Sequence, residues 1–134
     1  MSSSFAQIHD GKFVSEEIQS IGGVDFVGLI SGNGKIENYT PDTEILPSKQ
    51  KKEMFCMGIA LRHKMQNDFD EDFEPVKYNV TERGNFKFVT IPILSKILFV
   101  RMKRDFDHLE LINKITPFFT NYLKAREYIN RNEA

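Results

Sequence analysis

The sequence predicts a single α+β domain in which a five-stranded antiparallel sheet is flanked by helices, in the order helix, two strands, long helix, three strands, helix. Its length of 134 residues is typical of one domain. The composition, with 40% hydrophobic and 28% charged residues, is that of a chain with one buried core. Along the chain the apolar residues change between a period of two and helical spacing, which indicates both strands and helices.

The strongest local signal is a β-hairpin in the first third of the chain. Apolar residues dominate 24–31, and the Gly-Asn-Gly sequence at 32–34 is typical of a tight turn before a second strand at 35–40. A helix is expected before the hairpin, because Ser15 is a favourable start and the glycine pair at 22–23 a favourable end.

A long helix is predicted over residues 48–68, since Ser48 can cap it and apolar residues follow at helical spacing. The residues that recur at three- and four-residue steps are predicted to form one buried stripe: Met54, Met57/Gly58, Leu61 and Met65. Phe55 and Ile59 lie off this stripe, so the helix is apolar over more than one face. A helix that covers one sheet needs only one such face.

The remaining strands are predicted at 75–82, 86–91 and 97–103, with a short connection at 92–96. Apolar and polar residues alternate between Val76 and Thr81, as in a strand with one wet face. The last strand is nearly all apolar, which suits a central position in the sheet. Asp107 can cap a closing helix, and Pro117 should kink it or divide it in two.

No catalytic or metal-binding pattern is found, and no cofactor is expected. Cys56 and His63 share a face of the predicted helix but lie about 10 Å apart along it, too far for a nucleophile–base pair. The acidic residues at 68, 70 and 72 begin like a calcium loop, yet Phe73 stands where that loop needs glycine and Asn79 where it needs an acid. We therefore expect no enzyme activity.

Charge and cysteine content narrow the partners and the compartment. The net charge of −1 provides no field for nucleic acid or an anionic membrane, and no stretch is apolar enough to span a bilayer, so neither partner is predicted. A small basic cluster of Arg101, Lys103 and Arg104 is interpreted as solvated charge. The single cysteine cannot form an intramolecular disulfide, so a cytoplasmic location is expected.

The charges at the two ends of the long helix suggest self-association. Basic residues occupy its first turn (Lys49, Lys51 and Lys52), and acidic residues crowd its end (Asp68, Asp70, Glu71 and Asp72). Both placements oppose the helix dipole. In an antiparallel two-fold homodimer, each basic start would face the partner's acidic end, and Phe55 and Ile59 would lie at the apolar centre of the interface. Ile59→Glu would then be expected to give folded monomers. The alternative is two solvated charge runs, each losing about 0.3 kcal/mol or slightly more.

The order of elements and the sequence of residues 21–36, Ile-Gly-Gly-Val-Asp-Phe-Val-Gly-Leu-Ile-Ser-Gly-Asn-Gly-Lys-Ile, resemble the roadblock/dynein light chain family and its longin and profilin-like relatives. The last third, with its proline-containing turn at Pro92 and its closing helix, resembles the end of that domain. The resemblance covers roughly residues 15–125. It implies a five-stranded antiparallel sheet, homodimers or heterodimers, and roles as non-catalytic adaptors or regulators of small GTPases. It assigns no functional residue.

Two functions remain open. The first is a homodimeric regulatory or scaffolding module that recruits a protein partner, such as a small GTPase or a signalling protein. The alternative is a small-ligand-sensing domain of the PAS or GAF type, which would need a roomy apolar pocket with a few convergent polar groups. A scaffold should instead have a filled core and exposed apolar area on its outer helix or an edge strand. An enzyme ranks below both.

Overall fold

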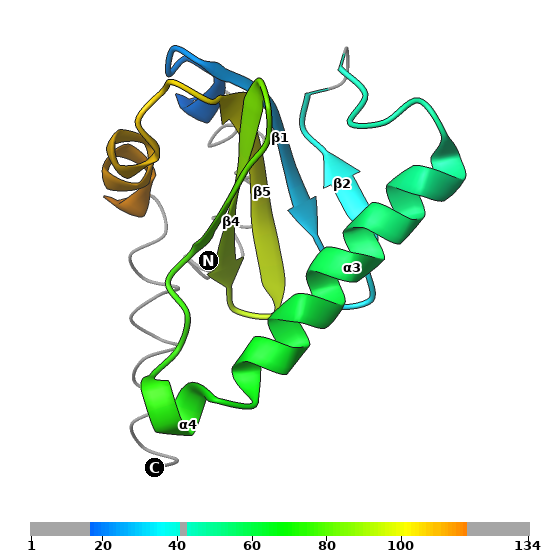
Figure 1. Cartoon of the computed structure of the whole chain (residues 1–134), viewed down its shortest axis with the longest axis vertical. Helices are drawn as coiled ribbons and strands as arrows, with labels where there is room; N and C mark the ends of the chain where they lie inside the picture. The colour runs from blue at the N-terminus through cyan, green and yellow to red at the C-terminus, as the bar shows by residue number, and fades with distance from the viewer. Residues whose placement is uncertain (1–16, 41–42, 118–134) are drawn as a thin grey trace, which may run out of the picture.

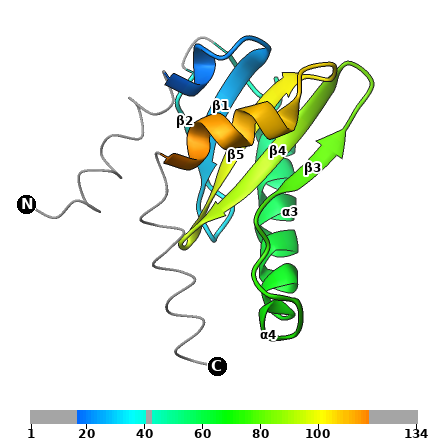
Figure 2. The ribbon, with the colours of Figure 1, turned by 90° about the vertical axis from the view of Figure 1, so that its left-hand side faces the viewer.

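The computed structural model describes residues 17–40 and 43–117, which form a sheet with helices on both faces (Figures 1 and 2). The named elements are β1 (Val24–Ile30), β2 (Ile36–Asn38), α3 (Lys49–Asn67), α4 (Asp70–Phe73), β3 (Asn79–Glu82), β4 (Phe86–Ile93) and β5 (Lys96–Lys103). Residues 17–19 and 108–117 are also helical. Ser15, the expected start of the first helix, lies outside the described residues.

All five strands belong to one antiparallel sheet, in the order β2-β1-β5-β4-β3. The predicted fold class is confirmed. The central place of β5 agrees with its nearly all-apolar sequence, and β2 and β3 are the edges. The hairpin prediction is also confirmed, because β1 pairs with β2 in a register that sets Ile30 opposite Ile36.

Three predicted strand boundaries were wrong by two residues or more. β2 ends at Asn38 and not at residue 40, β3 begins at Asn79 and not at residue 75, and β4 continues to Ile93 through the proline that was expected in a connection. β3 pairs with β4 only as far as Thr90, so Pro92 lies where β4 has no neighbour on that side. Its missing N–H therefore removes no hydrogen bond from the ladder.

The side chains of β5 alternate between two hydrophobic clusters, one on each face of the sheet. Leu98, Val100 and Met102 join the cluster that includes Ile18 and Leu111 from the helical segments near the two termini. The opposite cluster is covered by α3 and consists of Phe26, Ile30, Ile45, Cys56, Ile97 and Phe99. Figure 2 shows α3 and the helix at 108–117 on opposite sides of the sheet. The long helix thus covers one face, as predicted.

The turn between β1 and β2 packs directly against α3. Gly34 donates its N–H to Ser31 O over 3.0 Å and has a φ of +84°, a conformation that favours glycine. A Cβ at this position would lie 2.9 Å from Met57 Cα, so a larger residue would push the turn and the helix apart. Because Gly34 has no side chain, the hairpin turn can pack closely against α3.

The end of β5 corrects the interpretation of the basic cluster. Arg101 Nε donates to Asp25 Oδ1 over 2.8 Å, and its guanidinium lies 5.9 Å from the Phe26 ring centroid and 5.2 Å from that of Phe86. Arg101 is thus a paired, mostly buried group rather than solvated charge. After the strand, Asp107 caps the last helix as predicted by accepting the N–H of Leu109 at 2.9 Å. Pro117 was expected to kink this helix or divide it in two; it is the last helical residue described, and the residues that follow it lie outside the described part of the chain.

Candidate interaction surface

The inner face of α3 is the one that contains Phe55 and Ile59. Both side chains are half-buried against the sheet-side cluster, and the Phe55 ring centroid lies 5.6 Å from the centroids of Phe88 and of Phe99. Cys56 and Ala60, the two buried residues of the helix, complete this face. The structure therefore places Phe55 and Ile59 toward the sheet and away from the surface on which the sequence interpretation had put them.

The outer face of α3 carries a continuous row of exposed apolar side chains: Met54, Met57, Leu61 and Met65, hereafter the outer row. Met54 is 75% exposed, Leu61 51% and Met65 67%. The prediction that these residues form the buried stripe was wrong. Both rows repeat at three- and four-residue steps, so spacing alone could not decide which of them meets the sheet.

The outer row is continued past the end of α3 by Phe69 and Phe73, which are 56% and 79% exposed. Their ring centroids lie 6.4 Å apart at α4. They add two exposed apolar side chains beyond the C-terminal end of the outer row. Large apolar side chains exposed on successive turns of one helix make this face a candidate contact surface.

The two charged ends of α3 differ in how the structure accommodates them. Ser48 caps the helix as predicted by accepting the N–H of Lys51 at 3.3 Å, and Lys52 Nζ lies 3.9 Å from Glu44 Oε2. At the other end Asp68 is the C-cap of α3, whereas Asp70 and Asp72 fall in the first turn of α4. Acidic residues suit the start of a helix, so the expected conflict with the dipole is reduced at the acidic end.

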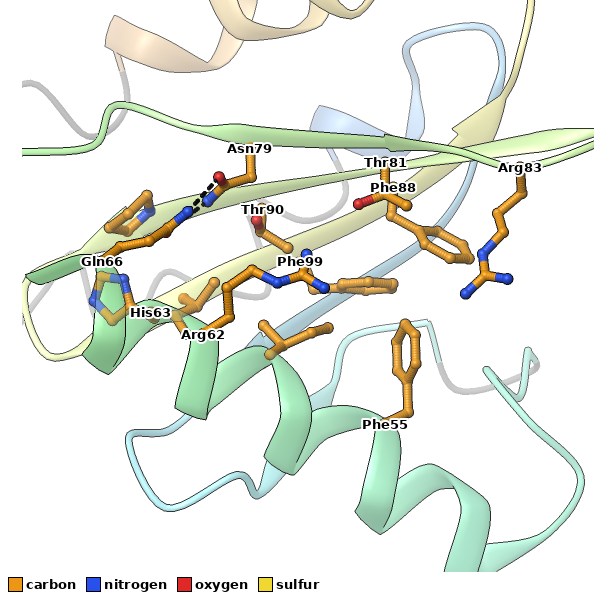
Figure 3. Close-up of a pocket in the computed structure, with 13 residues that line it drawn as sticks. Phe55, Arg62, His63, Gln66, Asn79, Thr81, Arg83, Phe88, Thr90 and Phe99 are labelled. Carbon is orange, nitrogen blue, oxygen red and sulfur yellow. Dashed lines mark hydrogen bonds between the residues drawn. The ribbon is translucent and has the colours of Figure 1, made fainter.

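A groove lies between the inner face of α3 and the strands β3 and β4, with a cavity of about 60 Å³ (Figure 3). Its floor includes the aromatic rings of Phe55, Phe88 and Phe99. Its polar lining consists of Arg62, His63 and Gln66 from α3, Asn79 and Thr81 from β3, Arg83 from the following turn, and Thr90 from β4. Sequence reasoning missed this site, because its residues come from three separate segments and form no local motif.

The described residues contain no arrangement typical of a catalytic centre. Burial raises the pKa of the Cys56 thiol, and the positive charge of Lys52 only partly opposes this effect, so the reactive thiolate is disfavoured. Residues 17–40 and 43–117 contain no cluster of three or more side chains able to hold a metal ion. In the same part of the chain, no helix has the length and apolarity that crossing a bilayer requires.

The fold recurs in solved structures with very different sequences. The Roadblock/LC7 domain from Streptomyces avermitilis aligns with a TM-score of 0.62 at 13% identity, over 88% of this chain and 96% of that domain. The fold is roadblock-like. The resemblance proposed from the sequence is thereby confirmed at the level of the fold.

Two further structures share the roadblock-like architecture. Myxococcus xanthus MglB aligns with a TM-score of 0.58 at 11% identity, over 84% of this chain and 90% of its own. The gliding protein MglB from Thermus thermophilus aligns with a TM-score of 0.59 at 8% identity, over 93% and 94% of the two chains. No protein-family model matches the sequence, and no curated protein is detectably similar to it.

Proposed function

We propose that this roadblock-like domain is a non-catalytic regulatory or scaffolding module that acts as a homodimer, joined through the outer row of α3. The observation that carries the proposal is the exposure of the outer row, since four large apolar side chains in succession are left in water by the folded chain. A structurally similar protein, MglB, has been solved in a tetrameric arrangement, at a TM-score of 0.56 and 9% identity. Association between roadblock-like chains is thus known in a protein of this fold.

The charge order of α3 favours an antiparallel arrangement of the two copies. A two-fold axis close to Leu61 would bring Lys49, Lys51 and Lys52 of one copy near Asp68, Asp70 and Asp72 of the other. Leu61 would then contact its own counterpart, with methionines on either side. Phe55 and Ile59 are excluded from this interface by their place against the sheet. The apolar area would supply most of the affinity, and the exposed charges would mainly fix the orientation.

Two matched leucines provide the test. Leu61 is 51% exposed in the outer row, and Leu109 is 50% exposed on the helix at 108–117, on the opposite side of the sheet. Leu61→Glu would set two carboxylates against each other at the axis and should give folded monomers, whereas Leu109→Glu should leave the dimer intact. Sedimentation velocity at tens of micromolar measures both. A wild-type monomer at that concentration, or equal effects of the two substitutions, would contradict the proposed interface.

The choice of Leu61 replaces the test that the sequence suggested. Ile59→Glu would place a carboxylate in the cluster formed by Phe55, Phe88 and Phe99, so it should destabilise the fold itself. Loss of a dimer in that variant would not distinguish a broken interface from a damaged domain.

The partner class that we propose is a small GTPase, as the roadblock resemblance implies. Immobilised wild-type protein should capture such a GTPase from an extract of the source organism in one nucleotide state only. Leu61→Glu, as a folded monomer, tests whether the dimer is needed for capture. Failure to capture any GTPase in either nucleotide state would count against this partner and leave the dimer proposal to its own test. A pocket of about 60 Å³ is far below the roughly 300–1,000 Å³ typical of drug-sized ligands, so it is not the roomy pocket that a sensor of the PAS or GAF type would need.

A further inference from the structure

The groove beneath α3 is cationic, and no acidic side chain lines it. Arg62 enters it from the helix and Arg83 from the turn after β3, so the two guanidiniums approach the cavity from different elements (Figure 3). Within residues 17–40 and 43–117, neither guanidinium forms an ion pair. Their donors are therefore available to an anion, and a guanidinium is well matched to a carboxylate because it can donate two parallel hydrogen bonds.

The interior of the groove is apolar. Phe99 and Ile97 form its deepest wall and are buried, and the rings of Phe55 and Phe88 flank them. The hydroxyl groups of Thr81 and Thr90 lie on the strand side. Apolar lining with a few polar groups at fixed places is typical of small-molecule sites. Arg62 and Arg83 are exposed and lie on the solvent side of this apolar interior. A ligand would therefore direct its charged group outward and its apolar group inward.

The size of the cavity limits the ligand. A water-sized sphere needs about 10–15 Å³ of such volume, so a cavity of about 60 Å³ holds roughly four to six non-hydrogen atoms. This room suits a short branched carboxylate and excludes nucleotides and other cofactor-sized molecules. We propose that the groove binds a short-chain organic carboxylate, with its apolar chain against the half-buried rings of Phe55 and Phe88 and its carboxylate toward Arg62 and Arg83. The proposal does not depend on the dimer, because none of the outer row lines the groove.

The test uses probes that separate charge from shape. Isobutyrate and isobutyramide have nearly the same size, but only isobutyrate is charged, whereas inorganic phosphate is charged and lacks an apolar group. Titration of the full isotope-labelled chain, followed by amide chemical shifts, should show isobutyrate moving the signals of Thr81, Arg83 and Thr90. Binding should be about tenfold weaker for isobutyramide, because charge-assisted hydrogen bonds are lost. Phosphate should also bind more weakly, because it leaves the apolar floor in water.

Matched variants locate the charge. Arg62→Gln and Arg83→Gln should each weaken isobutyrate binding about fivefold, since both arginines are partly screened by water. Lys64→Gln removes a charge from the exposed side of the same helix and should change nothing. The amide spectra also report whether each variant is folded. Equal binding of isobutyrate and isobutyramide, equal effects of Lys64→Gln and Arg62→Gln, or no shifts at tens of millimolar isobutyrate would each overturn the proposal.

Discussion

The side-chain amides of Gln66 and Asn79 exchange two hydrogen bonds: Gln66 Nε2 donates to Asn79 Oδ1 over 2.8 Å, and Asn79 Nδ2 donates to Gln66 Oε1 over 3.1 Å. Gln66 lies in the last turn of α3, and Asn79 is the first residue of β3. The pair therefore joins the helix to an edge of the sheet, across a segment of the chain that contains α4. It also forms one end of the groove.

This amide pair should contribute measurably to stability. Each single substitution, Gln66→Ala or Asn79→Ala, leaves one half-buried amide without its partner, so each should lower the free energy of unfolding by about 1–3 kcal/mol. In the double variant no unmatched amide remains, and the two losses should fall short of additivity by about 1 kcal/mol. Urea unfolding of the four proteins measures this coupling. Additive losses would show that the two hydrogen bonds contribute nothing as a pair.

Two glycines should respond in opposite ways to alanine. Gly58 lies in the exposed interior of α3 with nothing within 4 Å of an added Cβ, so Gly58→Ala should stabilise the domain by about 0.5–1 kcal/mol. Gly34→Ala forces a Cβ against Met57 at a positive φ and should destabilise it by about 1–3 kcal/mol. Thermal unfolding in the Leu61→Glu background separates these effects from dimerisation. The same sign for both substitutions would contradict the packing of the hairpin turn on α3.

Tyr39 should make stability fall at high pH. The pKa of Tyr39 is raised from 10.0 to about 12, mainly by burial. The hydroxyl also donates a hydrogen bond to Glu37 Oε2 over 3.0 Å, and this bond and the negative charge of the carboxylate raise the pKa further. Because the folded-state pKa is the higher one, this contribution is fully present below pH 10 and is lost as the pH rises toward 12. The stability difference between wild type and Tyr39→Phe should therefore shrink over this range. Tyr78→Phe serves as the control, and an unchanged difference would contradict the shift.

The proposed dimer should respond to charge reversal at its ends. Lys49→Glu should raise the dimer dissociation constant about two- to fivefold, as expected for an exposed ion pair, and Asp72→Lys in the same chain should restore it. Asp105→Lys, an exposed change in the turn after β5, should not restore it. Sedimentation equilibrium at low salt measures the constants, and raising the salt should reduce these differences. Equal rescue by Asp72→Lys and Asp105→Lys would indicate a net-charge effect and not an antiparallel pairing.

Local signals were sufficient to predict most of the fold. The Gly-Asn-Gly turn fixed the first hairpin, Ser48 the start of α3, and Asp107 the start of the last helix, because each acts through backbone atoms a few residues away. The start of β3 was predicted less well. Tyr78 and Val80 both pack on the core, so the apolar alternation is real, but the hydrogen-bonded ladder begins only at Asn79.

The candidate site could not be predicted in the same way. The two apolar rows of α3 have the same period. Contacts between Phe55 and the rings of Phe88 and Phe99, on two different strands, determine which row faces the sheet. The groove likewise combines Arg62 from a helix with Arg83 from the turn after a sheet edge, two residues that are distant in the sequence. Such contacts are set by tertiary packing, for which neighbouring residues in the sequence contain no signal.

Three of the four residues in the outer row are methionines, and this has a consequence for the choice of partner. A methionine side chain is unbranched and polarizable, so it can change conformation to fit apolar surfaces of different shape. A face built mainly from methionine would accept the equivalent helix of a related chain nearly as well as that of an identical one. Selectivity between identical and mixed pairs would then depend on the lysines and aspartates at the ends of α3, where a mismatched partner brings like charges together.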